Sequence, residues 1–174
     1  MIVYFVRHAS AGTHLSSPKK DEKRPLDKIG LEQSAQMGRA LASMDVQVDL
    51  ILSSPLKRAV QTASLVGNEL GYEGSLLFED GLRPNASYSD FRKMLQKHAN
   101  KQMVMVVGHN PSLSQFLGKS ICNKDCEASI DLKKGAAARV DIEQRSMLWC
   151  ITPRVVKSLQ SVTTTNSRPK SSRK

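Results

Sequence analysis

The chain has 174 residues, 40% of them hydrophobic, with three cysteines and a formal net charge of +10. This length and hydrophobic content suit one domain with one core, and the odd cysteine count argues against a disulfide framework and for a reducing cytoplasm. The N-terminal hydrophobic run stops at Arg7, far short of a secretory signal or a membrane span, so we expect a cytoplasmic protein without membrane contact.

Hydrophobic spacing predicts alternating strands and helices along most of the chain. Strands are predicted at residues 3–6, 50–52, 75–78 and 103–107, and a lysine-rich polar loop at residues 16–23 follows the first of them. Helical spacing occurs at four places, with inward faces formed by Leu31, Ala35, Gly38, Leu41 and Ala42, by Ala59, Val60, Ala63, Val66 and Leu70, by Phe91, Met94 and Leu95, and by Leu113, Phe116 and Leu117.

Two of these helices begin directly after a strand. Ser54 and Asn110 are the predicted N-caps, and Pro55 and Pro111 suit the first helical position. Gly71 is expected to end the first of these two helices.

The sequence pattern of residues 136–151 predicts a β-hairpin. Its strands are residues 136–142 and 147–151, with a turn near residues 143–146. Cys122 and Cys126 precede it without a nearby His or further Cys, so free thiols are favoured over a zinc site. Strand–helix units followed by a hairpin predict an α/β fold, a three-layer α/β/α sandwich with a mostly parallel sheet and an antiparallel C-terminal hairpin.

The positive charge is concentrated at the C-terminus. Residues 152–174 contain six Lys or Arg and no acidic residue, which leaves only +4 of the +10 for the rest of the chain. We expect one catalytic domain over residues 1–157 and a basic, disordered tail over residues 158–174. The tail is either a solvated end without function or a contact for nucleic acid, an acidic protein or anionic lipid.

Three predicted strand ends carry residues suited to phosphate chemistry. Arg7 and His8 follow the first strand, Arg58 lies in the first turn of the helix after the second, and His109 follows the fourth. Each has an ordinary explanation when taken alone, such as an exposed helix arginine or a loop histidine. Ligands of open α/β sheets bind at the carboxyl ends of strands, so these residues should meet in one crevice.

A neutral imidazole beside a fixed cation can attack phosphorus and form a transient phosphohistidine, while guanidinium groups hold the phosphate oxygens. No cluster of carboxylates accompanies these residues, which argues against a metal. The pattern therefore predicts a phosphate pocket without a metal ion.

These residues together make the chain resemble the histidine phosphatase superfamily, also called phosphoglycerate mutase-like, over about residues 1–152. The resemblance rests on Arg7-His8-Ala9, on Ser53-Ser54-Pro55 with Arg58-Ala59 and Gln61-Thr62-Ala63, and on Gly108-His109-Asn110-Pro111. The short length and Arg24-Pro25-Leu26 with Gly30 are similar to the SixA-type phosphohistidine phosphatase branch. Ala9 departs from the commoner family signature, which has Gly at this position.

The resemblance implies a role for each matching residue. His8 would be the nucleophile, Arg7, Arg58 and His109 would bind and stabilise the transferring phosphoryl group, and Arg24 would add a further phosphate contact. No cofactor is implied. We expect the guanidinium groups to lower the pKa of His8 and its second ring nitrogen to make an orienting hydrogen bond.

The proton donor to the leaving group is where the match is weakest. Phosphoester phosphatases and mutases of the family use a carboxylic acid, and the corresponding stretch here, residues 79–82, places Gly81 at that position. Glu79 or Asp80 is the candidate general acid. An imidazole, with a pKa of about 6.5 when free, leaves more easily than an alkoxide, so a missing acid favours a phosphohistidine substrate.

We therefore expect a metal-independent phosphatase, a hydrolase that dephosphorylates a phosphohistidine-bearing phosphotransfer protein through a covalent intermediate at His8. A phosphatase of small phosphorylated metabolites is the alternative within the enzyme class. A non-catalytic module that binds anions through the pocket or the tail is the alternative outside it, although 5% aromatic residues give little stacking surface for nucleic acid. His14, His98 and Lys57 are expected at the surface without a role.

Overall fold

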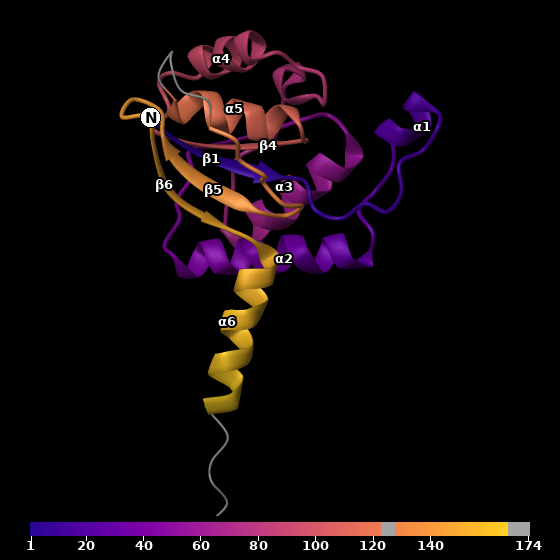
Figure 1. Ribbon diagram of the computed structural model, residues 1–174, viewed down its shortest axis with the longest axis vertical. Coiled ribbons are helices and arrows are strands. Elements are labelled where there is room, and N and C mark those ends of the chain that lie inside the picture. The colour runs from indigo at the N-terminus through magenta and orange to yellow at the C-terminus, as the bar shows by residue number, and fades with distance from the viewer. Residues whose placement is uncertain (123–127, 167–174) are drawn as a thin grey trace, which may run out of the picture.

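The computed structural model describes residues 1–122 and 128–166, the last part, residues 162–166, by its backbone alone. The elements in chain order (Figure 1) are β1 (Ile2–Arg7), α1 (Pro18–Glu22), α2 (Lys28–Ser43), β2 (Leu50–Ser53), α3 (Lys57–Glu69), β3 (Leu77–Phe78), a short 3-10 helix (Asp80–Leu82), α4 (Tyr88–Lys97), β4 (Met103–Gly108), α5 (Ser112–Ile121), β5 (Ala137–Asp141), β6 (Ser146–Ile151) and α6 (Pro153–Asn166).

One six-stranded sheet organises the domain, in the order β3-β2-β4-β1-β5-β6. The first four strands in this order pair in parallel, whereas β5 runs antiparallel to β1 and β6 antiparallel to β5. Helices α4 and α5 cover one face of the sheet and α2 and α3 the other (Figure 1). The predicted three-layer α/β/α fold with a C-terminal hairpin is confirmed.

Strand β1 shows how the sheet divides the core into two layers. Val3 and Phe5 pack with the buried residues of α4 and α5, whereas Tyr4 and Val6 pack with those of α2 and α3. Successive side chains of a strand point to opposite faces, so a continuous hydrophobic run is what a strand covered on both sides requires.

Helix α2 is rotated relative to the predicted inward face. Leu31 is 43% exposed, and the buried positions are Gly30, Ser34, Met37, Gly38 and Leu41. The cause is the close approach of Gly30 to the loop after β1, because a Cβ atom at Gly30 would lie 1.9 Å from the carbonyl oxygen of Ser10. This glycine brings α2 against the loop that carries the residues following β1.

The predicted N-caps of α3 and α5 are wrong. Helix α3 begins at Lys57 with Leu56 as its N-cap, and α5 begins at Ser112 with Pro111 as its N-cap. The side chains of Ser54 and Asn110 make other bonds: Ser54 Oγ lies 2.8 Å from a ring nitrogen of His109, and Asn110 donates to the carbonyl of Leu132 at 3.0 Å. Gly71 follows the end of α3 with a positive φ of 68°, as expected.

The C-terminal segment differs from the expected disordered tail. Helix α6 continues to Asn166, so residues 158–166 are helical, and the remaining residues, 167–174, lie outside the described part of the chain, as does Cys126. Val156, buried in the same core layer as α2, anchors the start of this helix. Within the described ranges no helix is long and apolar enough to cross a membrane.

Candidate active site

The three strand ends singled out in the sequence are neighbours in the sheet. Strands β2, β4 and β1 lie side by side and parallel, and Arg7 is aligned with Gly108 at the end of β4. The residues that come immediately after these strands, His8, Ser54 and His109, therefore lie together at one edge of the sheet. Open α/β folds bind their ligands at this edge.

His8 is fixed by both its backbone and its ring. Its backbone N–H donates to the carbonyl of Gly108 at 3.0 Å, and the next N–H, of Ala9, donates to Thr62 Oγ1 at 3.1 Å. The ring Nδ1 lies 2.7 Å from the carbonyl oxygen of Ala9. A carbonyl oxygen can only accept a hydrogen bond, so Nδ1 carries the proton. The lone pair of Nε2 is then free to attack phosphorus.

The environment of His8 keeps its imidazole neutral. Burial is the largest cause and, together with the charges of Arg58, Arg7 and Lys134, it lowers the pKa of His8 to about 3, against the opposing effect of the Ala9 carbonyl. The expected influence of the guanidinium groups is present, but it ranks behind burial. Near neutral pH the ring is therefore neutral, with the proton on Nδ1 and none on Nε2.

His109 lies beside His8, with 4.9 Å between the ring centroids. Its side chain is buried, its Nε2 lies 2.8 Å from Ser54 Oγ, and its pKa is lowered to about 2, first by burial, then by electrostatic coupling to His8 and by the charge of Arg58. The serine hydroxyl can donate to Nε2, which leaves the proton on Nδ1. Ser54 thus orients a site residue, a role that its predicted use as a helix cap concealed.

Several buried donors of this site have no partner. Arg7 uses Nη1 to bond the carbonyl of Leu132 at 2.9 Å, and Arg58 uses Nη1 to bond that of Asp21 at 2.9 Å. Arg7 Nε, Arg58 Nε and His109 Nδ1 are buried without a hydrogen-bond partner among the described residues. Each unsatisfied buried donor costs about 1–3 kcal/mol, a cost that an anion with several acceptor oxygens would relieve.

A residue that the sequence reasoning missed links these donors to the loop after β1. Asp21 lies on α1, in the segment expected to be a polar loop, and is only 5% exposed. Its carboxylate accepts from Arg24 Nε at 2.8 Å and lies 3.2 Å from Arg58 Nη1 and 2.8 Å from His14 Nδ1. Burial alone would raise the pKa of Asp21, but the hydrogen bonds from Arg24 and Leu15 and the two guanidinium charges lower it far below its ordinary value.

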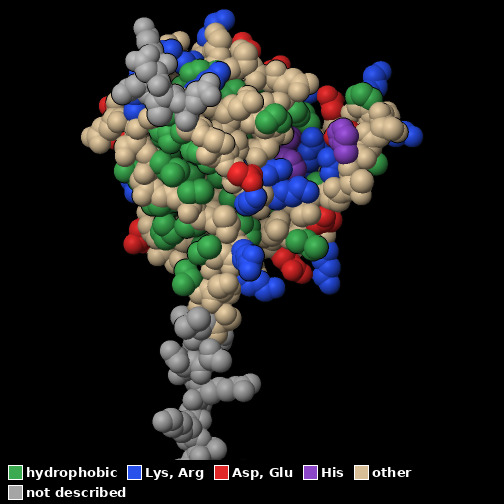
Figure 2. Space-filling model, viewed as in Figure 1, with side chains coloured by type: hydrophobic (Ala, Val, Ile, Leu, Met, Phe, Trp, Pro, Cys, Tyr) green, Lys and Arg blue, Asp and Glu red, His purple; other side chains and the backbone are tan. Residues whose placement is uncertain are grey.

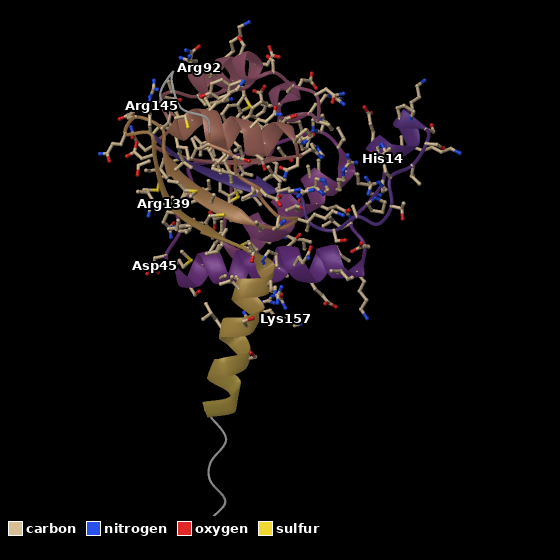
Figure 3. The ribbon with its side chains drawn as sticks, viewed as in Figure 1. His14, Asp45, Arg92, Arg139, Arg145 and Lys157 are labelled. Atoms are coloured by element: carbon tan, nitrogen blue, oxygen red, sulfur yellow. The ribbon has the colours of Figure 1, made fainter. Side chains whose placement is uncertain are left out.

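These residues surround one cavity of about 640 Å³. His8, Arg24, Arg58 and His109 line it, whereas Arg7, next to His8 in the chain, is not among its lining residues and lowers the pKa of His8 through its charge. The lining residues that the sequence analysis did not assign include His14, Asp21, Glu22, Arg83 and Lys134. Figure 2 shows Lys and Arg side chains gathered around His side chains in this hollow, and Figure 3 places His14 on the loop that leads to α1.

Neither candidate general acid lines this cavity. Glu79 lies 3.4 Å from His98 Nε2 and 3.7 Å from Lys97 Nζ, and Asp80 pairs with Arg83 Nε at 2.6 Å. Both carboxylates are thus held in ion pairs outside the cavity lining. Over the part of the chain that the structure describes, no group of three or more His, Cys, Asp or Glu is suited to a metal ion.

Comparison with known proteins agrees with this geometry. A family model described as histidine phosphatase superfamily (branch 1) matches residues 3–86. The phosphohistidine phosphatase SixA of Escherichia coli K12 is 31% identical over 124 residues, 70% of this chain and 74% of that protein. An uncharacterised protein of Picosynechococcus is 29% identical over 162 residues, 87% of this chain and 96% of its own length.

The structural likeness extends over nearly the whole domain. The solved structure of the protein histidine phosphatase SixA complexed with tungstate superposes with a TM-score of 0.78 at 25% identity, covering 90% of this chain and 99% of that one. Sequence, fold and the convergence of His8, Arg58 and His109 agree, and the resemblance seen in the sequence is confirmed. The chain belongs to the histidine phosphatase superfamily, in its SixA-like branch, and this membership implies a phosphatase, a hydrolase.

Proposed function

We propose that this protein is a phosphohistidine phosphatase that removes the phosphoryl group from a phosphohistidine of a phosphotransfer protein. The observation that carries the proposal is the buried, neutral ring of His8, whose Nδ1 is hydrogen-bonded to the Ala9 carbonyl, beside the unsatisfied donors of Arg58 and His109 in the same cavity. A neutral nucleophile next to anion-binding donors suits phosphoryl transfer, which is catalysed mainly by positioning and electrostatic stabilisation.

In the first step, His8 Nε2 attacks the phosphorus of the substrate phosphohistidine. The new N–P bond forms as the substrate N–P bond breaks, and the substrate ring, whose other nitrogen carries a proton, departs as neutral imidazole with the electron pair. Arg24, Arg58 and His109 stabilise the charge on the phosphoryl oxygens, Arg58 and His109 with donors that have no partner in the protein.

In the second step, water attacks the phosphorus of the His8 intermediate. The O–P bond forms, the bond to Nε2 breaks, and inorganic phosphate leaves while the proton of the water passes to solvent. His8 returns to its neutral state, with Nε2 free of a proton, because its pKa is lowered to about 3.

The choice of a phosphohistidine substrate is supported by the carboxylates around the cavity. Asp21 is held ionised by its guanidinium and backbone partners, and Glu22 is paired with Arg83 Nη1 at 2.9 Å, so neither is suited to protonate a leaving group. An imidazole leaves with little help, whereas an alkoxide needs a proton.

A phosphatase of small phosphoesters is the second candidate, and His14 is the observation in its favour. This histidine lines the cavity, its side chain is 79% exposed, and its Nδ1 is paired with Asp21. In its protonated form it can donate a proton to an alkoxide.

The test compares phosphate release from a phosphohistidine phosphotransfer domain with release from a small phosphate monoester. Wild type, His8→Ala and the control His98→Ala, whose histidine lies outside the cavity lining, are assayed on both substrates. Rapid release from the protein that His8→Ala abolishes and His98→Ala preserves supports the proposal. A strong preference for the ester moves the assignment to the second candidate, and turnover of neither substrate contradicts both and favours an anion-binding module.

A further inference from the structure

We propose that Asp21 is a positioning residue of this site, which holds the guanidinium groups of Arg24 and Arg58 in place for phosphate binding. The inference rests on the proposed function, because phosphate is the ligand that it assigns to these groups. Asp21 itself is not expected to touch the reacting atoms.

The contacts of Asp21 join parts of the chain that are distant in sequence. One carboxylate oxygen accepts from Arg24 Nε at 2.8 Å and from the Leu15 N–H at 3.0 Å, and the other lies 3.2 Å from Arg58 Nη1. The backbone carbonyl of Asp21 also accepts from Arg58 Nη1, at 2.9 Å. The side chains of Asp21 and Arg58 are 7% and 6% exposed, so water screens their interaction little.

A carboxylate is unexpected in the lining of an anion site, because its charge repels phosphate. The two guanidinium groups explain its presence, since they also repel one another. Burial is the main cause that lowers the pKa of Arg58, and the charge of Arg24 lowers it further, whereas Asp21 raises it. The negative charge of Asp21 thus offsets the repulsion between the guanidinium groups of Arg24 and Arg58, which must lie close together to bind one phosphate.

The carboxylate also restricts where the two side chains can point. Arg24 is held at Nε by Asp21 and at Nη1 by the carbonyls of Ala11 and Gly12, and Arg58 is held at Nη1. Both guanidinium groups keep further N–H donors for the phosphate oxygens. Because long arginine side chains lose much conformational freedom when they bind, holding them beforehand strengthens phosphate binding.

Substitution of Asp21 by Asn separates positioning from charge. If Asp21 acted through its charge alone, Asp21→Asn would raise the affinity for inorganic phosphate. Positioning predicts the opposite: a loss of about tenfold or more in phosphate affinity, because misplaced binding groups are costly. The readout is direct titration of inorganic phosphate into the protein, with inhibition of phosphohistidine dephosphorylation by inorganic phosphate measured beside it.

Glu22→Gln is the matched charge control. Glu22 lies on the same helix and lines the same cavity, but its carboxylate is 54% exposed and pairs with Arg83 rather than with Arg24 or Arg58. We expect Glu22→Gln to raise phosphate affinity slightly, by removal of a negative charge. Opposite directions for the two variants support the proposal, and a gain or no change in both overturns it.

Asp21→Glu is a second test in case Asp21→Asn fails to fold. Thermal unfolding of each variant shows whether it is folded. It keeps the charge and moves the carboxylate by one methylene group, so positioning predicts weakened phosphate binding and a charge-only role predicts wild-type binding. Direct phosphate titration does not need turnover, so a failure of the proposed function, seen as no His8-dependent activity, is distinguishable from a failure of this inference.

Discussion

The two walls of the cavity are built in different ways. One, the strand wall, consists of His8 and His109, which line the cavity, together with Ser54, which contacts His109; all three follow neighbouring strands. The other, the loop wall, consists of residues 12–24 with the short helix α1, whose exposed segments are joined to the domain by the contacts of Asp21. Arg58, at the start of α3, contacts the loop wall from the strand side.

This difference suggests separate roles for the two walls, one in the chemical step and one in phosphate binding. The strand wall sets the state of His8, the proposed nucleophile, because burial and the Ala9 carbonyl fix the charge and the tautomer of its ring. The loop wall brings cations whose positions depend on ion pairs rather than on a sheet. Changes in the strand wall should therefore affect chemistry, and changes in the loop wall should affect phosphate binding.

The largest effect is expected where the two walls meet. Arg58→Lys keeps the charge but removes the planar fork that bonds Asp21 and leaves donors for phosphate. We expect kcat/KM to fall about 100-fold, the usual cost of losing an oriented donor to a transition state. Steady-state kinetics measure it, with Arg39→Lys as control because Arg39 pairs with Glu69 on the surface. Activity within a few fold of wild type would show that the two walls act independently.

A smaller effect is expected within the strand wall. Ser54→Ala removes the partner of His109 Nε2 and leaves that buried nitrogen unsatisfied. We expect kcat to fall about tenfold, which corresponds to about one hydrogen bond, while KM changes little. Ser53→Ala is the matched control, since Ser53 is equally buried but bonds only the carbonyl of Ser54. An effect on KM alone would place Ser54 among the binding groups instead.

The smallest effect on activity is expected from the ionisation of His8. Its pKa is lowered from 6.5 to about 3, so a profile of kcat/KM against pH should show no loss due to this residue between pH 6.5 and about 4. Stability behaves differently: in that interval the unfolded chain binds a proton that the native ring does not, so the free energy of unfolding falls as the pH is lowered. Urea unfolding of wild type and His8→Gln measures this, and equal pH slopes would contradict the buried, neutral His8.

The strand wall could be predicted from the sequence, and the loop wall only in part. Arg7, His8 and His109 follow hydrophobic runs that predict strands, and the rule that ligands bind at strand ends places them together. Arg24 was assigned through the family resemblance. Asp21 was missed because its partner Arg58 lies 37 residues away, and no local pattern records that contact.

Other errors have similar causes. Ser54 suits both a helix N-cap and a hydrogen bond to a histidine, and only the position of His109 decides between them. Glu79 and Asp80 were chosen by their register against a family pattern, whereas the cations that they pair with, Lys97 and Arg83, are set by packing. The helical residues 158–166 have a polar composition that does not reveal the anchoring of α6 by Val156.

Detection of a covalent phosphate on His8 tests the proposed mechanism directly. Wild type and His8→Ala would be mixed with a phosphohistidine phosphotransfer domain, quenched in alkali, in which phosphohistidine survives, and digested for mass spectrometry. We expect phosphate on the peptide that contains His8 in the wild type and none in the variant. Full turnover without phosphate on this peptide, or phosphate transfer that persists in His8→Ala, would contradict it.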